Sequence, residues 1–184
     1  PVNMEELRVL SDTHNLWIIE DACHAPGGYF IDSNSKKNFC GNGKYSDIGV
    51  FSFHPVKHIA CGEGGMLTIN SKELYEKLIL LRTHGITKDN VQENQGGWYY
   101  EMIELGFNYR LTDFQSALGI TQLAKNKKGV ERRNEISSAY KKAFEGKIKF
   151  QQLPVRAYNA HHLFIIEVEK RKELYDFLHS QGVL

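Results

Sequence analysis

Short apolar runs alternate with helix-spaced apolar positions in the first part of the chain. Met4, Leu7 and Leu10 recur at the spacing of one helix face, and the apolar run 16–19 follows, ending at Glu20 and Asp21. Two further apolar runs cover residues 48–53 and 66–69, with a proline and a glycine-rich turn between them. The pattern predicts a helix followed by three short buried strands.

The second part of the chain is mainly helical in pattern. Ser71 is a predicted N-cap of a helix that ends at Gly85, and Thr112 with Gln115 forms the capping box of another. The segment 87–104 has no clean period and is predicted to be a long loop that lines a pocket. A strand at 162–166 and a final helix ended by Gly182 close the chain. The helix after Thr112 is expected to bury the face formed by Phe114, Ala117, Leu118 and Thr121.

The composition changes near the middle of that long helical region. Residues 125–149 are basic and polar, which favours a domain boundary near Val130. We therefore expect residues 1–129 to be part of a large domain and residues 130–184 to be a linking helix and the start of a small C-terminal domain. The ends, at Pro1 and Leu184, have the appearance of cuts within a longer chain.

Composition and charge limit the partners. The 184 residues are 41% hydrophobic, which is enough for one sizeable core. Lys and Arg total 23 against 22 for Asp and Glu, so no global field favours nucleic acid or an anionic membrane. Three cysteines without a C-x-x-C pair, and no apolar run long enough to cross a bilayer, favour a reducing cytoplasm.

Four residues near the predicted strand ends could carry chemistry. Asp21 follows a predicted strand, at the edge where open α/β sheets bind ligands, and would suit a cation, although an acid that caps a turn is the more common case. His24 has the same ambiguity. Lys57 would need partial desolvation near other cations to act through an unprotonated amine, and Ser52 could donate its hydroxyl to a phosphate. None of these residues is diagnostic alone.

Metal and nucleotide sites are weaker alternatives. His54 and His58 have helical metal-ligand spacing, but Pro55 argues against a continuous helix between them. His161 and His162 would point to opposite faces of a strand. The turn 62–65 lacks the Gly-Lys-Ser/Thr ending of a P-loop and is predicted to be a tight turn. We therefore expect no metal site.

Taken together, four segments resemble the DegT/DnrJ/EryC1/StrS family of sugar aminotransferases, which depend on pyridoxal 5'-phosphate (PLP). They are WIIEDACHAPGG, YSDIGVFSFHPVKHIACGEGGMLTIN, RTHGI and LGFNYRLTDFQSALG, in the family's order and at about its spacing. The resemblance implies a fragment of the fold-type-I PLP-dependent transferase fold. That fold is α/β, with a mainly parallel sheet, flanking helices and a small C-terminal α+β domain, and it forms a homodimer whose active sites lie at the subunit interface.

The resemblance also assigns roles. Lys57 matches the catalytic lysine that carries the cofactor, and Asp21 matches the acid that pairs with the pyridine nitrogen. His24 would lie near the ring, Ser52 would bind the phosphate, and Asn108 would reach the phosphate of the neighbouring subunit's cofactor. Related dehydratases have a histidine at the lysine position, so Lys57 favours transamination. A catalytically silent or regulatory member is a further alternative, and a metal-dependent hydrolase is the least favoured.

Within the family, the chain most resembles the aminotransferases of pseudaminic acid synthesis. The segments HGITK and WYYEM add to the motifs above. This similarity implies a UDP-linked 4-keto-6-deoxy N-acetylhexosamine as substrate and glutamate as amino donor. The family's phosphate-binding turn and cofactor-stacking aromatic ring have no counterpart in the sequence, so we attribute the function to the parent protein.

Overall fold

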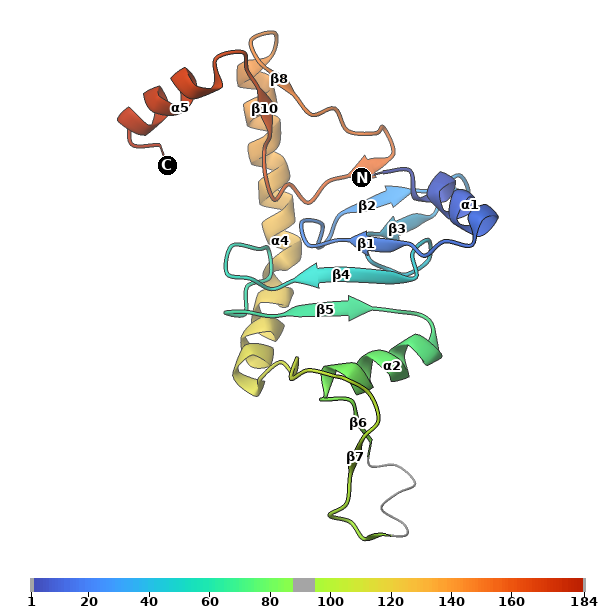
Figure 1. Cartoon of the computed structure of the whole chain (residues 1–184). Helices are drawn as coiled ribbons and strands as arrows, with labels where there is room; N and C mark the ends of the chain where they lie inside the picture. The colour runs from blue at the N-terminus through green and yellow to red at the C-terminus, as the bar shows by residue number, and fades with distance from the viewer. Residues whose placement is uncertain (1, 88–94, 184) are drawn as a thin grey trace.

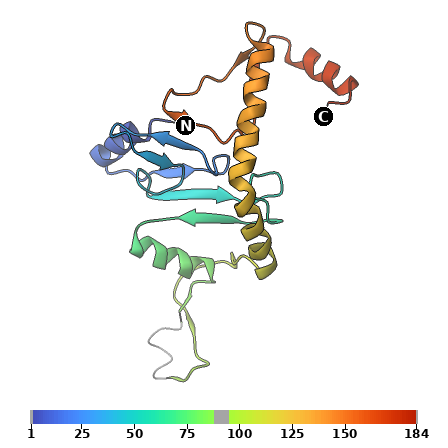
Figure 2. The same cartoon turned by 180° about the vertical axis from the view of Figure 1, so that it is seen from behind.

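The computed structural model of the chain describes residues 2–87 and 95–183 (Figures 1 and 2). Its first part contains helix α1 (Met4–His14), strands β1 (Ile19–Asp21), β2 (Tyr29–Ile31), β3 (Lys37–Phe39), β4 (Ile48–Ser52) and β5 (Gly65–Thr68), and helix α2 (Lys72–Arg82). Strands β6 (Ile86–Thr87) and β7 (Glu101–Met102) precede the long helix α4 (Asp113–Phe144). Strands β8 (Lys149–Phe150), β9 (Ala157–Tyr158) and β10 (Ile166–Glu167) and helix α5 (Arg171–Ser180) follow.

The main sheet has the strand order β1-β4-β5, and the α/β fold class is confirmed. Strand β1 is parallel to β4, with Ile19 opposite Ile48 and Asp21 opposite Val50, whereas β4 and β5 are antiparallel. The prediction of three buried strands is wrong for β1 and β5. Ile19, on the edge strand β1, is 66% exposed, while the central strand β4 is buried or half-buried along its length.

Hydrogen bonds tie the start of β1 to α1 and to the turn before β4. Asp47 accepts a hydrogen bond from the Ile18 amide at 2.7 Å, and the Arg8 guanidinium of α1 donates to the same carboxylate at 3.3 Å. The Ser11 hydroxyl donates to the Leu16 carbonyl at 2.5 Å. These contacts fix the helix and the two parallel strands relative to one another.

Helix α4 begins at the predicted capping box, in which the Thr112 hydroxyl and the Gln115 backbone and side chain bond reciprocally. It then runs past the end of the sheet where β4 finishes and β5 starts (Figures 1 and 2). The expected buried face is wrong: Phe114 is 91% and Leu118 44% exposed, and the helix instead buries Val130 against the loop after β1. The described residues therefore cover only part of the surface of α4.

The helix continues unbroken through the expected boundary near Val130. Beyond it, the predicted strand 162–166 is reduced to Ile166–Glu167, which pairs with β8. Strand β9 pairs with β2, so the chain returns to the first part of the molecule. The division into residues 1–129 and 130–184 therefore remains a proposal.

The predicted loop 87–104 begins and ends in a strand pair. Ile86 lies opposite Met102 and Thr87 opposite Glu101, while residues 88–94 lie outside the described residues. No described helix is long and apolar enough to cross a membrane.

Large apolar side chains remain exposed over much of the surface. The chain exposes 13571 Å², whereas a folded monomer of 21.1 kDa exposes roughly 9,000 Å². Many of these exposed apolar side chains lie on α4 or on the segment before it. On the helix they include Phe114, Ile120 and Leu123, and on the preceding segment Trp98, Leu105 and Tyr109. Surfaces of this kind mark contact sites for other polypeptide segments.

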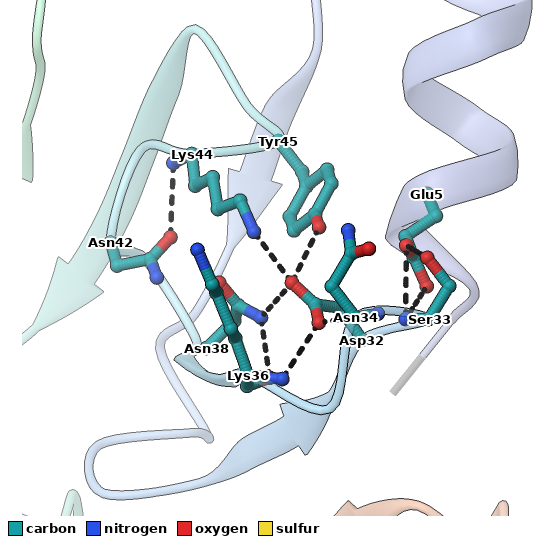
Figure 3. A network of polar contacts seen from close by, with 9 residues as sticks. All are labelled: Glu5, Asp32, Ser33, Asn34, Lys36, Asn38, Asn42, Lys44 and Tyr45. Atoms are coloured by element: carbon teal, nitrogen blue, oxygen red, sulfur yellow. Dashed lines mark hydrogen bonds and ion pairs between the residues drawn. The ribbon is translucent and has the colours of Figure 1, made fainter.

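A fully buried carboxylate organises the hairpin β2–β3, which the sequence pattern did not predict (Figure 3). Asp32 Oδ1 accepts from the amides of Asn34 and Lys36, at 3.0 and 2.8 Å. Oδ2 accepts from the Asn38 amide, the Lys44 ammonium and the Tyr45 hydroxyl, the second at 2.6 Å. The Lys44 ammonium, followed by the Lys36 amide, holds the pKa of Asp32 well below its usual range.

We expect Asp32→Asn to destabilise the fold, because an amide nitrogen would face donors at either oxygen position. A carboxyl whose pKa is depressed on folding contributes stability above its unfolded pKa of about 4, and this contribution is lost as pH falls below that value. Wild-type stability should therefore fall as the pH drops from 5 to 3, and the variant should show a weaker dependence. Urea unfolding at each pH measures both effects.

Asp12→Asn is the matched control for this experiment. Asp12 also pairs with a basic residue, Arg8, but its side chain is 66% exposed. Its replacement should change the unfolding free energy by no more than about 0.5 kcal/mol. Equal effects of the two substitutions would contradict the role given to Asp32.

Candidate active site

The parallel pairing of β1 and β4 brings two predicted site residues to one edge of the sheet. Asp21 ends β1 and Ser52 ends β4, and in the ladder Asp21 lies opposite Val50. The loops that follow both strands carry the other two predicted residues, His24 and Lys57. This edge is where open α/β sheets bind ligands.

The loop after β4 places the Lys57 amine against His24. Lys57 Nζ lies 2.5 Å from His24 Nε2, and the Lys57 side chain is half-buried. The loop is fixed by its own apolar residues, because Phe53, Ile59 and Cys61 form a buried cluster. Backbone hydrogen bonds from Phe53 to Gly64 and from Cys61 to Phe53 close it.

Asp21 is held in its charged form. The Cys23 amide donates to Asp21 Oδ1 at 3.0 Å, and hydrogen bonds from the Cys23 thiol and amide, with smaller contributions from His24 and Lys57, lower the pKa of the carboxyl. Burial raises the pKa of the Cys23 thiol to about 11, so this cysteine is not an activated nucleophile. The site therefore offers an anion at Asp21 beside an amine at Lys57.

Ser52 is half-buried at the end of β4, and its Oγ accepts a hydrogen bond from the His54 amide at 3.3 Å. The hydroxyl proton can still be donated to an anion. The turn 62–65 bends at Gly62 and Glu63 and leads into β5 at Gly65, where an added Cβ would lie 2.8 Å from the Phe51 carbonyl oxygen.

Helix α4 supports both loops from the side. Gln115 Nε2 donates to the Glu63 carbonyl of the second loop at 2.8 Å, and Asn126 Nδ2 donates to the Pro26 carbonyl of the first at 3.2 Å. The two donors are eleven positions apart on one rigid helix, so the spacing of the loops is set by the helix.

Asn108 lies apart from the other predicted residues. It is exposed and forms an isolated bridge with Thr83 at the end of α2. Among the described residues, its contacts do not connect it to Asp21, His24, Ser52 or Lys57. The structure therefore brings four of the five predicted residues together.

Two further histidines lie at the site and were not predicted to do so. His58 and His162 contact each other, and His162 contacts His24. The expected strand at His161 and His162 is wrong, since His161 has a positive φ of 49° and both precede β10. No sequence signal links His58 with a segment about a hundred positions later. Within residues 2–87 and 95–183, no group of three His, Cys, Asp or Glu side chains is arranged to hold a metal ion.

An open cavity of about 460 Å³ adjoins Asp21 and His24. Its walls come from α1, β1, β2 and the segment 158–160, and they are more apolar than polar in character. They include Met4, Ile18, Phe30 and Tyr158. The acid and histidine of the site thus border a space large enough for a small organic molecule.

The chain is an α/β protein that gathers an acid, a histidine and a lysine at the carboxyl edge of its sheet, which is the edge where open α/β sheets bind ligands. The chain belongs to the DegT/DnrJ/EryC1/StrS aminotransferase family, whose model matches residues 1–184.

Individual relatives of known name are similar to this chain. The chain is 39% identical to a UDP-4-amino-4,6-dideoxy-N-acetyl-beta-L-altrosamine transaminase of Campylobacter jejuni. The match covers 99% of this chain and 47% of that protein. It is 33% identical to the spore coat polysaccharide biosynthesis protein SpsC of Bacillus subtilis, over 92% of this chain and 43% of that one. The chain thus spans about half the length of the curated relatives it matches.

Solved structures agree with the fold. PseC of Helicobacter pylori, an aminotransferase involved in the biosynthesis of pseudoaminic acid, superposes with a TM-score of 0.83 and 30% identity, over 99% of this chain and 47% of that one. A DegT DnrJ EryC1 StrS aminotransferase of Brucella abortus superposes with a TM-score of 0.84 and 28% identity, over 99% and 45%. The mixed sheet and long helix described above are therefore part of the fold of sugar aminotransferases.

The segment that carries Asn108 depends on a close contact between two glycines. A Cβ on Gly106 would lie 2.7 Å from the Leu81 carbonyl oxygen and 2.6 Å from the His84 carbonyl carbon, and the Gly85 amide would be closer still. We expect Gly106→Ala to destabilise the protein by about 2 kcal/mol or more, because backbone must move. Thermal or urea unfolding measures the change.

Gly129→Ala is the control for this substitution. Gly129 lies within α4 with open space where a Cβ would be, so alanine should stabilise the helix by about 0.5–1 kcal/mol. A stability loss from Gly106→Ala no larger than that of an ordinary surface change would contradict the packing described here.

Proposed function

We propose that the full-length protein, comprising this chain and any flanking sequence, is a PLP-dependent aminotransferase. The observation that carries the proposal is the pairing of the Lys57 amine with His24 beside the anionic Asp21, at the carboxyl edge of the sheet. Membership of an aminotransferase family supports the same reaction class.

The residues present fit PLP. Asp21 supplies a carboxylate whose pKa is lowered, which suits a protonated ring nitrogen, and Ser52 supplies a hydroxyl for a phosphate oxygen. Lys57 supplies the primary amine that such a cofactor needs for covalent attachment. When bound, PLP supplies an electron sink for charge that develops at the amino carbon.

The chain's own groups would handle the proton and the orientation. Lys57 Nζ would carry the proton between the amino carbon and the cofactor, acting as both base and acid. Asp21 would keep the ring nitrogen protonated, and His24 would orient the lysine from 2.5 Å away. Asp21 ends β1 and His24 lies three residues later in the loop that follows, so the two groups are held close together.

The substrates come from the relatives. We propose that the amino group moves from glutamate to the 4-keto group of a UDP-linked 4-keto-6-deoxy N-acetylhexosamine, in the synthesis of pseudaminic-acid-type glycans. The names of the Campylobacter jejuni and Helicobacter pylori proteins support this assignment. We also propose a cytoplasmic location, which the free thiols of Cys23, Cys40 and Cys61 support.

A homodimer with shared active sites completes the proposal. The exposed position of Asn108, away from Lys57, suits a residue that acts on a neighbouring subunit's cofactor. The exposed apolar residues of α4 and of segment 98–109 provide surface for that contact.

Asp21→Asn in the PLP-loaded full-length protein tests the proposal. Glutamate should change the visible absorbance of the wild-type protein within seconds to minutes, and the variant should do so about 100-fold more slowly, because the ring nitrogen loses its anionic partner. Stopped-flow or steady absorbance measurements give the rates.

Glu20→Gln is the matched control, since Glu20 is adjacent on β1 but accepts a hydrogen bond from Ser46 instead. Its rate should stay within a few-fold of wild type. A wild-type protein whose absorbance ignores glutamate, or an Asp21→Asn protein with the wild-type rate, would refute the proposed function.

A further inference from the structure

Three histidine rings lie in a row beside Lys57, and His162 is the middle one. The centroids of the His24 and His162 rings are 4.2 Å apart with planes tilted by 41°, and those of His58 and His162 are 5.3 Å apart with a tilt of 45°. His24 is in turn the residue that contacts the Lys57 amine. The order of contact is therefore His58, His162, His24, Lys57.

Three side chains from two elements fix the backbone around His162. Arg133 of α4 donates to the carbonyls of His161 and His162, at 3.1 and 3.4 Å, and Asn134 donates to the Asn159 carbonyl at 2.9 Å. From the Lys57 loop, His58 Nε2 lies 3.0 Å from the Ala160 carbonyl. The ring of His162 is thus placed by α4 and by the loop it contacts.

The contacts suit packing rather than metal binding or proton transfer. His58 Nε2 faces a carbonyl, which only accepts, so that nitrogen carries the proton. The Nδ1 atoms of His58 and His162 are buried and have no hydrogen-bond partner among the described residues. Burial, then the neighbouring His24 and His58, lower the pKa of His162 to about 4, so its ring is neutral at neutral pH.

The neutral His162 ring packs against the His24 ring and leaves His24 Nε2 directed at Lys57 Nζ. A protonated His162 ring at the same position would repel the lysine. Aromatic pairs at such separations contribute beyond their buried area. Without the ring, His24 would gain side-chain freedom.

We propose that His162 is a positioning residue of the Lys57 site, whose ring holds His24 with Nε2 towards the lysine amine. The proposal rests on the proposed function in one respect, namely that Lys57 is the cofactor lysine. It extends that function by giving the segment after α4 a part in the site formed by the β1 and β4 loops.

The test measures His24 directly in the cofactor-free full-length protein. Diethyl pyrocarbonate modifies accessible neutral imidazoles, and peptide mapping by mass spectrometry gives the rate at His24 separately from the other histidines. The variants are His162→Leu, which fills the space without an aromatic ring, and His162→Phe, which keeps a ring. His161→Asn is the control, because asparagine tolerates the positive φ and, in the part of the chain that the structure describes, the aromatic ring paired with His24 is that of His162 and not that of His161.

His162→Leu should raise the modification rate of His24 by about three- to tenfold, the range that corresponds to loss of an aromatic pair. His162→Phe and His161→Asn should stay within about twofold of wild type, since the first restores the ring contact. An unchanged rate in His162→Leu would overturn the proposal. An acceleration of similar size in His162→Phe would overturn it as well, and this outcome can be read even where the leucine variant unfolds.

Failure of the proposed function would appear in the response to PLP and glutamate, and not in the modification rates at His24. A protein that ignores PLP and glutamate but shows the predicted rates at His24 would keep the positioning role and lose the aminotransferase. A protein that transaminates while His24 reacts identically in every variant would keep the function and lose the role of His162.

Discussion

The parallel pairing of β1 with β4 is the constraint on which the candidate site depends. Parallel strands end at the same edge of a sheet, so Asp21 and Ser52 project from neighbouring strand ends although they are 31 positions apart in the sequence. The register is anchored at the other end by Asp47, which binds the Ile18 amide and Arg8. A slip of this pair by one residue would turn Asp21 to the opposite face of the sheet.

The long helix α4 converts this edge into a site with defined walls. It bonds to the loop of Asp21 through Asn126, to the loop of Lys57 through Gln115, and to the segment of His162 through Arg133. A helix is stiff over these distances, so loops that would otherwise move independently share one support. The segment after the helix thereby reaches a site whose acid and amine come from the first sixty residues.

Local signals in the sequence were sufficient for part of this account. Ser71 and the pair Thr112 and Gln115 predicted two helix starts correctly, because capping depends on residues three positions apart. Asp21, His24, Ser52 and Lys57 could be selected by their places after predicted strands and by family resemblance, and the structure brings these four together.

The remaining features depend on contacts that local patterns do not encode. The apolar face at Phe114 was expected to be buried, yet the described residues leave it exposed, since periodicity predicts an apolar stripe but not what covers it. The Asp32 network joins a turn to Lys44 and Tyr45, and residues 27–44 have no apolar period to indicate the hairpin. His162 reaches His24 across about 140 positions, and only the fold reveals that contact.

The central claim is that Lys57 is the lysine that carries PLP, and covalent trapping tests it most directly. The PLP-loaded full-length protein would be reduced with borohydride, digested and mapped by mass spectrometry, with a Lys57→Arg protein in parallel. The account predicts a pyridoxyl group on the peptide containing Lys57, and its absence from the arginine variant. A pyridoxyl group on another lysine, or none in the wild-type protein, would contradict it.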